Sequence, residues 1–481
     1  MSSTSARARS RRWLGLGVIA TAQFMVIMDT SIIGVALPRM QADLGFGPDG
    51  LSWVFNAYVV ALGGLLLLGG KLSDVLGARR VFAAGWVVLL GGSLVAALAQ
   101  GPAVELAGRA VQGAGSALIA PSALTLLFML FGADPRELTR ALAVYGAAAP
   151  AGGTAGVFLG GVITEYLSWP WVFYLNVPIA LVVLAAVPRV MPPGAGAAGS
   201  RVDVLGALTV TAGLAAAVFG VVKAPEVGWG AGQTWLALGA GVVLLAAFVA
   251  LQARGRQPLA RLGIFRAPNL AAANLAQVLL GAAWIPMWFF LNLYLQQVLG
   301  YSAFPSGAAL LPMTALIMVG MVVLAPRVMA AFGPGRTTLA GMLLLAAGMA
   351  WLSQVDADGS YAVDVLPASL VAALGMSLAF IPTLGTAISA ARPEEGGLAS
   401  GIVNTSYQVG SALGLAVMTA VASGAGADRL GDAAALTHGY AAAFVGAAVV
   451  AVAGALAAGA LLRPRPEPAV GDVEVDHVRA A

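Results

Sequence analysis

Apolar segments long enough to cross a lipid bilayer recur from one end of this sequence to the other, and no other feature constrains the fold as strongly. A bilayer-spanning helix needs about 20 mostly apolar residues. Of the 481 residues, 60% are hydrophobic and 10% are charged, whereas a soluble globular protein carries roughly 25% charged residues. So few ions could not cover a soluble fold of this size. The sequence therefore predicts an all-α membrane protein and nearly excludes a soluble enzyme.

Hydropathy and helix-breaking residues divide the chain into fourteen predicted transmembrane helices. Their ranges are 14–38, 51–70, 81–99, 104–130, 141–164, 171–188, 203–223, 234–253, 269–298, 304–326, 337–354, 364–390, 398–423 and 440–462. The first is interpreted as a retained anchor, because its apolar stretch is too long for a cleaved signal peptide and contains Asp29.

The basic residues orient these helices. With the N-terminus in the cytoplasm, 21 of the 25 basic residues fall in cytoplasmic connections and tails, three fall outside, and Arg109 falls within a helix, which accounts for all 25. Adding or removing one predicted helix would move many of these basic residues to the opposite side of the membrane. Both termini are therefore predicted to be cytoplasmic. Because topology explains the net charge of +4, we expect no nucleic-acid partner.

A short repeat divides the helices into two sets. The segments 71–80 and 327–336 each place a glycine six residues after a base and a second base three residues beyond that glycine. Their matching positions, two helices into each set, indicate two six-helix bundles separated by an inserted pair. The predicted division is a cytoplasmic N-terminal tail (1–13), an N-terminal six-helix bundle (14–188), a linker with two inserted transmembrane helices (189–268), a C-terminal six-helix bundle (269–462) and a cytoplasmic C-terminal tail (463–481).

Several motifs carry a family resemblance that covers nearly the whole chain. They run from Phe24 to Pro38, from Gly70 to Arg80, from Arg109 to Gly115, from Trp169 to Pro178, from Asp203 to Gly206, and from Gly397 to Gly414. Together they resemble the major facilitator superfamily, in its fourteen-helix drug:proton antiporter branch of QacA/EmrB-type exporters. The resemblance implies the major facilitator fold in the cell membrane. It also implies a proton-coupled exporter of amphipathic drugs or natural products, which works by alternating access and uses a proton gradient rather than a cofactor.

Two positions depart from the family pattern. Val157 stands in the fifth-helix antiporter motif where the family has proline, and Pro170 stands where the branch generally has arginine. The first departure keeps an uptake symporter or a facilitative carrier of a small organic solute open as an alternative. A membrane-embedded enzyme is a distant alternative, because no catalytic or metal-binding pattern is present. The chain has no cysteine, and its two histidines, His438 and His477, lie outside the apolar segments.

Two charged residues inside predicted helices are candidates for proton coupling. A charge near the bilayer centre costs at least about 2.5–3.5 kcal/mol, so burial favours the neutral form of Asp29 and makes it a candidate proton carrier. Its alternative role is structural, with hydrogen bonds to Thr30 or Ser31. Arg109 stays protonated, so it cannot carry the transported proton; the resemblance implies that it takes part in coupling. Its alternative is to snorkel to the outer interface with Glu105 as its partner.

Two further sets of residues are candidates for conformational roles. Asp74, Arg79 and Arg80 lie in the predicted loop between the second and third helices, where the resemblance implies a cytoplasmic gate that latches the two halves together. The same arginines would also set the topology. Small residues of the fifth-helix motif let helix backbones approach closely: Gly152, Gly156, Gly160 and Gly161. We expect the fifth and thirteenth helices to pack against each other and slide there, although static packing explains the glycines equally well.

Polar and aromatic side chains within the apolar segments are candidates for a substrate pocket. They are Gln23, Asn56, Tyr58, Gln112, Tyr145, Trp284, Trp288, Asn292, Asn404 and Gln408. Flat aromatic walls with a few amides suit a small amphipathic organic molecule. Because Asp29 is the only evident buried acid, neutral, zwitterionic or singly cationic cargo is favoured. The expected partners are this cargo, protons and the lipid bilayer; the oligomeric state is left open, and a monomer is compatible with the sequence.

Overall fold

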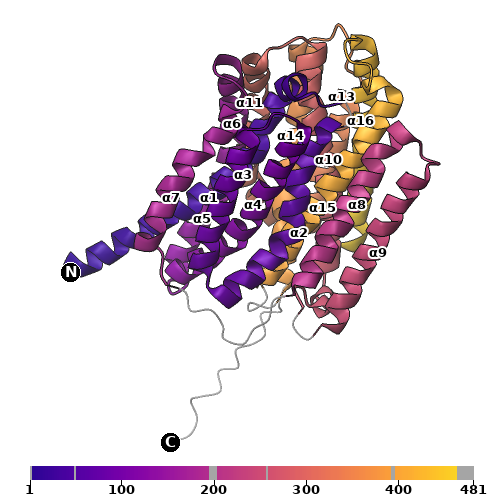
Figure 1. Cartoon of the computed structure of the whole chain (residues 1–481). Coiled ribbons are helices and arrows are strands. Elements are labelled where there is room, and N and C mark those ends of the chain that lie inside the picture. Colours follow the sequence, from indigo (N-terminus) through magenta and orange to yellow (C-terminus); the bar gives the residue numbers. More distant parts are fainter. Residues whose placement is uncertain (1–2, 48–49, 194–202, 256–257, 392–395, 463–481) are drawn as a thin grey trace, which may run out of the picture.

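The computed structural model describes residues 3–47, 50–193, 203–255, 258–391 and 396–462, and every regular element in them is a helix (Figure 1). In these ranges fourteen helical segments are long and apolar enough to cross a membrane, which confirms the predicted number. The N-terminal segments are α1 (Ser3–Leu44), α2 (Trp53–Leu76), α3 (Ala78–Ala97), α4 (Pro102–Phe131), α5 (Pro135–Tyr166), and the short α6 (Trp171–Tyr174) with α7 (Asn176–Val190).

The remaining segments contain several π-helical turns. After the pair α8 (Val204–Val227) and α9 (Gly232–Arg254) come α10 (Leu270–Leu293), α11 (Ala303–Val319) with α12 (Ala325–Phe332), α13 (Pro334–Leu352), α14 (Leu366–Ala390), α15 (Gly396–Ala422) and α16 (Ala433–Leu461). π-Helical turns extend or join them at Tyr294–Val298, Gly320–Leu324, Tyr361–Val365 and Ser423–Ala427.

The helices pack in two sets with an inserted pair at their seam. Helices α1 to α7 pack mainly on one another, and so do α10 and α12 to α16, whereas α11 packs chiefly against α5 of the first set. Helix α8 packs against α2 of the first set and α15 of the second, and α9 lies outside α8 at the edge of the bundle (Figure 1). The boundaries given above for the domains stay predictions. An inserted pair at the seam can influence both sets because α8 contacts both.

The repeated segments adopt the same backbone turn. Gly77 separates α2 from α3 with φ 90°, and Gly333 separates α12 from α13 with φ 81°. L-residues with a side chain rarely adopt such positive φ angles, so glycine is needed at both turns. The sequence repeat therefore marks structurally equivalent turns in the two sets.

Several helices are longer than predicted, and this changes the position of the gate residues. Helix α1 runs from Ser3 to Leu44 rather than 14–38, and α2 continues to Leu76. Asp74 is therefore in the last turn of α2, and Arg79 and Arg80 are in the first turn of α3. The prediction that these residues form a loop is wrong, because Gly77 alone makes the reversal between the helices.

The two ends of the bundle are referred to by the residues that mark them. The tail end carries Arg12, Gly77 and Leu462, and the far end carries Gln41 and Gln297. At the tail end, Arg12 Nη2 forms an ion pair with Glu137 Oε2 at 3.1 Å, which ties α1 to α5.

At the far end the two sets are joined by direct polar contacts. Gln297 Nε2 donates to Gln41 Oε1 (3.0 Å), and Gln296 Nε2 donates to the carbonyl of Val35 (3.1 Å). On another part of the seam, Phe304 N donates to Glu165 Oε2 (3.5 Å). These contacts join α1 and α5 to the helices that follow α9. The structure is therefore closed at the far end.

Candidate proton and cargo site

A buried ion pair lies inside the N-terminal set. Arg109 on α4 donates from Nη1 to Asp29 Oδ2 on α1 at 2.7 Å. The side chains of Arg109 and Asp29 are 0% and 1% exposed. Breaking such a pair by removing one partner costs about 3–5 kcal/mol, because a charge is left buried and unpaired. Two residues 80 positions apart therefore depend on each other.

Arg109 is also held by the helix beside it. Its Nε donates to the carbonyl of Val54 (3.0 Å), and Nη1 also donates to Gln112 Oε1 (2.8 Å). The guanidinium carbon lies 4.5 Å from the centre of the Tyr58 ring, in a cation–π contact. Arg109 is therefore fully buried and does not snorkel to an interface.

Two polar residues that the sequence did not single out, Asn176 and Ser93, complete the site. Asn176 Nδ2 on α7 donates to Asp29 Oδ1 (3.0 Å) and to Ser93 Oγ on α3 (3.0 Å). Gln112 Nε2 donates to the same two oxygens, at 3.1 and 2.8 Å. Asp29 thus accepts from α4 and α7 together. Asn176 lies in the Trp169 to Pro178 motif, and that placement was the one signal that could have pointed to it.

The hydroxyls expected to bond Asp29 in a structural role have other partners. The hydroxyls of Thr30 and Ser31 both donate to the carbonyl of Ile27, at 2.7 and 3.1 Å. Both hydroxyls thus bond a carbonyl of their own helix, and Arg109 bonds the Asp29 carboxylate. Serine and threonine commonly make such bonds within helices.

A second buried acid changes the count of carboxyl groups. Glu105, one turn before Arg109 on α4, is 0% exposed, although the sequence placed it near an interface. With two buried acids in the N-terminal set, the number of carboxyl groups no longer disfavours a dication as cargo. In the described part of the chain, no group of three metal-binding side chains is present.

The gate residues are apart in this structure. Asp74 and Arg80 are exposed, and Arg79 Nη1 donates to the carbonyl of Met191 (3.5 Å). Among the described residues no ion pair joins Asp74 to either arginine. Closure at the far end thus coincides with an unformed latch at the tail end.

The glycines of the fifth-helix motif pack on a different helix from the one expected. A Cβ atom on Gly156 or Gly160 would lie 2.8 or 2.7 Å from a carbonyl oxygen of α1, and Gly152 also abuts α1. Gly161 faces Ala303 and Phe304 of α11 instead. The expectation that the fifth and thirteenth helices pack together is wrong, because these faces are occupied by α1, α11 and, for α15, by α10.

The two departures from the family pattern have local explanations. Val157 is buried, and its carbonyl oxygen would lie 2.6 Å from a Cβ atom on Gly307 of α11. It therefore sits at the seam between the two sets. Pro170 has φ −61° and its carbonyl accepts from Phe173 N (3.0 Å). Proline is pre-organised to begin a helix, so it starts the short α6.

Aromatic side chains of α10 line the seam between the two sets. The ring centres of Trp288 and Phe55 of α2 are 5.7 Å apart, and those of Phe289 and Phe55 are 5.9 Å apart. Gly34 of α1 leaves room for the Trp288 ring and for Asn292. Helix α1 therefore carries both the acid of the ion pair and a contact with the seam.

The predicted pocket residues fall into three groups. Asn56, Tyr58, Gln112, Trp284, Trp288 and Asn292 are buried, Gln23, Tyr145 and Gln408 are half-buried, and Asn404 is exposed. Tyr58 and Gln112 belong to the ion-pair site described above, whereas Trp284, Trp288 and Asn292 belong to α10. The structure thus separates the candidates into a site inside the N-terminal set and a site at the seam.

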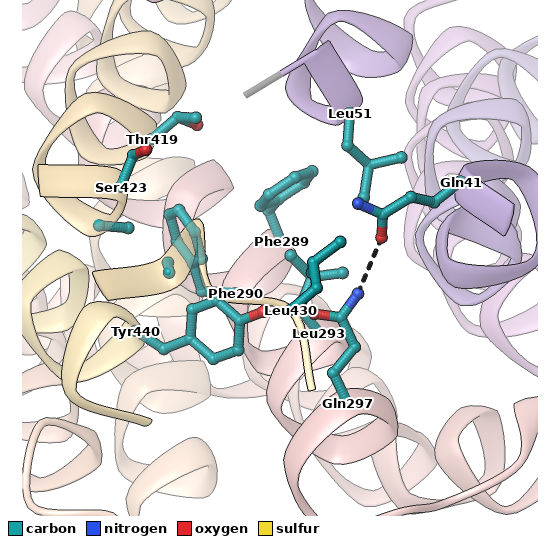
Figure 2. A pocket seen from close by; sticks show the side chains of 12 residues that line it. Gln41, Leu51, Phe289, Phe290, Leu293, Gln297, Thr419, Ser423, Leu430 and Tyr440 are labelled. Atoms are coloured by element: carbon teal, nitrogen blue, oxygen red, sulfur yellow. Dashed lines mark hydrogen bonds between the residues drawn. The ribbon is translucent and has the colours of Figure 1, made fainter. Parts of the chain in front are cut away.

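A small cavity lies at the closed end of the seam (Figure 2). Figure 2 shows Gln41 and Leu51 on one side, and Phe289, Phe290, Gln297 and Tyr440 on the other. Its volume of about 20 Å³ has room for about one water. The hydroxyl of Tyr440 donates to Gln297 Oε1 (2.5 Å) and so buttresses the bond to Gln41. A cavity of this size excludes an organic cargo.

Two helical bundles with a buried ion pair in one of them and an aromatic seam between them define a multi-pass membrane carrier. The chain belongs to the Major Facilitator Superfamily, whose family model matches residues 19–415. It is 41% identical over 441 residues to the cephamycin export protein CmcT of Amycolatopsis lactamdurans, covering 91% of this chain and 90% of that protein. It is 37% identical to the puromycin resistance protein pur8 of Streptomyces alboniger, covering 95% and 93%.

A solved structure shows the same fold. A mutant of the nucleoside transporter NupG superposes with a TM-score of 0.65 at 14% sequence identity, covering 94% of this chain and 99% of that one. At this identity the likeness concerns the fold alone. It supports a common helical architecture and carries no information about cargo.

Proposed function

We propose that this protein exports small amphipathic organic molecules, natural products among them, from the cell in exchange for protons. The observation that carries the proposal is the buried pair of Asp29 and Arg109, on a helix that also reaches the seam at Gly34. Protonation of Asp29 would remove the charge that holds Arg109. Helix α1 would then be free to shift against the glycine face of α5 and alter its contact with Trp288.

The relatives and the charge distribution support transport out of the cell. The relatives named above are an export protein and a resistance protein, which favours export over uptake. The positive-inside rule supports a cytoplasmic tail end, and we infer that the far end faces outward and that this structure is closed to the outside. An exporter in this state would accept cargo from the cytoplasm or from the inner leaflet.

The test of the proposed function is accumulation of a fluorescent amphipathic dye in a pump-deficient bacterial host. Cells expressing the protein should hold less dye than cells with an empty vector, and an uncoupler should abolish the difference because it collapses the proton gradient. Lower accumulation that survives the uncoupler would contradict proton coupling. Higher accumulation in expressing cells would instead support an uptake symporter or facilitative carrier.

Alternating access predicts that crowding the closed end will open it. In Gly307→Ala the new methyl would meet the carbonyl of Val157 at 2.6 Å. Overpacking costs about 1–3 kcal/mol, so the population open at the far end should rise about fivefold or more. The measurement is the labelling rate of a cysteine at Leu293, which lines the closed cavity, by a membrane-impermeant maleimide added to intact cells.

The chain suits this experiment because it contains no native cysteine. Gly146→Ala is the matched control, since a Cβ atom there would meet nothing within 4 Å, and it should leave the labelling rate unchanged. Equal rates in Gly307→Ala and the parent would contradict opening at this seam. Labelling only after the cells are permeabilised would show that the far end faces the cytoplasm.

A further inference from the structure

Glu105 is a buried acid that the proposed mechanism does not use. Its side chain is fully buried in the first turn of α4, and neither carboxyl oxygen has a hydrogen-bond partner. An ionised carboxylate in such surroundings is strongly disfavoured unless it is paired. Burial without a partner therefore favours the neutral, protonated form of Glu105 over the ionised form.

Arg109 has an unused donor one helical turn away. Its Nε and Nη1 are bonded to Val54 and Asp29, whereas Nη2 is buried without a partner. Side chains four residues apart on a helix are neighbours on its surface. An unsatisfied acid and an unsatisfied guanidinium nitrogen thus occupy adjacent turns of α4.

The charges of this cluster balance only if it holds one proton. The charged and titratable groups that act on Glu105 are Arg109 on its own helix and Asp29 on α1, and Tyr58 stacks on the guanidinium. Arginine stays positive, so the cluster is neutral when one carboxyl is ionised and the other is protonated. A net buried charge would be far more costly than either neutral arrangement.

We propose that Glu105 and Asp29 share a single proton, and that Arg109 pairs with whichever of the two carboxyls is ionised. This inference rests on the proposed proton role of Asp29 and adds a second proton-binding site to it. In the exchange, the O–H bond of Glu105 breaks, an O–H bond forms on Asp29, and Arg109 leaves Asp29 for Glu105. No proton is lost and the net charge stays zero.

The position of Glu105 gives the exchange a direction. Helix α4 begins at Pro102 on the far-end side, so Glu105 lies nearer that end than Arg109 does. The helix N-terminus also favours a negative charge there, which keeps the ionised form of Glu105 within reach once Arg109 turns toward it. A proton that enters from the far end would thus bind Glu105 first and then pass to Asp29.

The test is infrared spectroscopy of the purified full-length protein in lipid, in the region of the C=O stretch of protonated carboxyl groups. The parent should show a band that Glu105→Gln removes. Asp29→Asn should remove the same band, because Arg109 then lacks its partner and pairs with an ionised Glu105. Glu226→Gln is the control: Glu226 is an exposed acid paired with Lys223, and its loss should leave the band in place.

Each outcome decides the proposal without any transport measurement. A band that survives Glu105→Gln would show that Glu105 is not protonated. A band that Glu105→Gln removes but Asp29→Asn retains would show a permanently neutral structural acid, and the shared proton would be wrong. A thermal unfolding scan of each variant identifies a loss of fold, and Glu105→Asp then serves as the second variant, which should keep a band that Asp29→Asn removes. Failure of drug export would leave all of these spectra unchanged.

Discussion

Replacing Arg109 with leucine should lower the free energy of unfolding by about 3–5 kcal/mol. Arg109 is 0% exposed and binds Asp29 at 2.7 Å, so its removal leaves a carboxylate buried without its counter-charge. The variant also loses the hydrogen bond that Arg109 Nε donates to the carbonyl of Val54, and the cation–π contact with the Tyr58 ring. The measurement is the thermal unfolding midpoint of the purified protein in detergent, compared with that of the parent.

The double variant Asp29→Asn with Arg109→Leu separates the charge from the shape of the side chain. Removing both charges should recover a large part of the lost stability, because replacing a buried ion pair as a whole is often close to neutral. Arg79→Leu is the control for loss of an arginine at a partly exposed site, and it should change the midpoint little. Equal midpoints for the single and double variants would mean that packing of the arginine, and not its charge, stabilises the bundle.

The sequence was sufficient for the helix count because the bilayer imposes a simple requirement. Each span must be apolar over about 20 residues, and charged residues between spans follow the positive-inside rule. The repeated glycines at Gly77 and Gly333 were also visible, and the structure places both at turns where φ is positive. These are local properties, and a single chain displays them directly.

The partners of the site residues could not be predicted in the same way. Asp29 and Arg109 are 80 residues apart, and Asn176 and Ser93 are ordinary polar residues until α7 and α3 place them beside the carboxylate. The glycine spacing showed that α5 has a face of small residues, but it did not show that α1 would pack on that face. The sequence alone predicts an interfacial Glu105, because burial depends on the neighbouring helices as well as on the position in the span.

The chemistry of the pair is best tested by changing the acid alone. Asp29→Asn keeps the shape of the side chain and can still accept from Asn176 and Gln112, but it can neither bind a proton nor attract Arg109 as a charge. Hydrogen bonds to charged groups are worth about 1.5–3 kcal/mol. Loss of the ionisable group that attracts Arg109 should therefore slow proton-driven uptake of dye into inverted membrane vesicles by about tenfold or more.

The same variant should keep a second activity, because the seam is untouched. Exchange of dye down its concentration gradient needs the helices to move but does not need a proton, so Asp29→Asn should retain a measurable rate in vesicles without a proton gradient. Loss of both activities would point to a folding defect, which the unfolding midpoint would reveal. Uphill transport at the parent rate would remove Asp29 from the proton pathway.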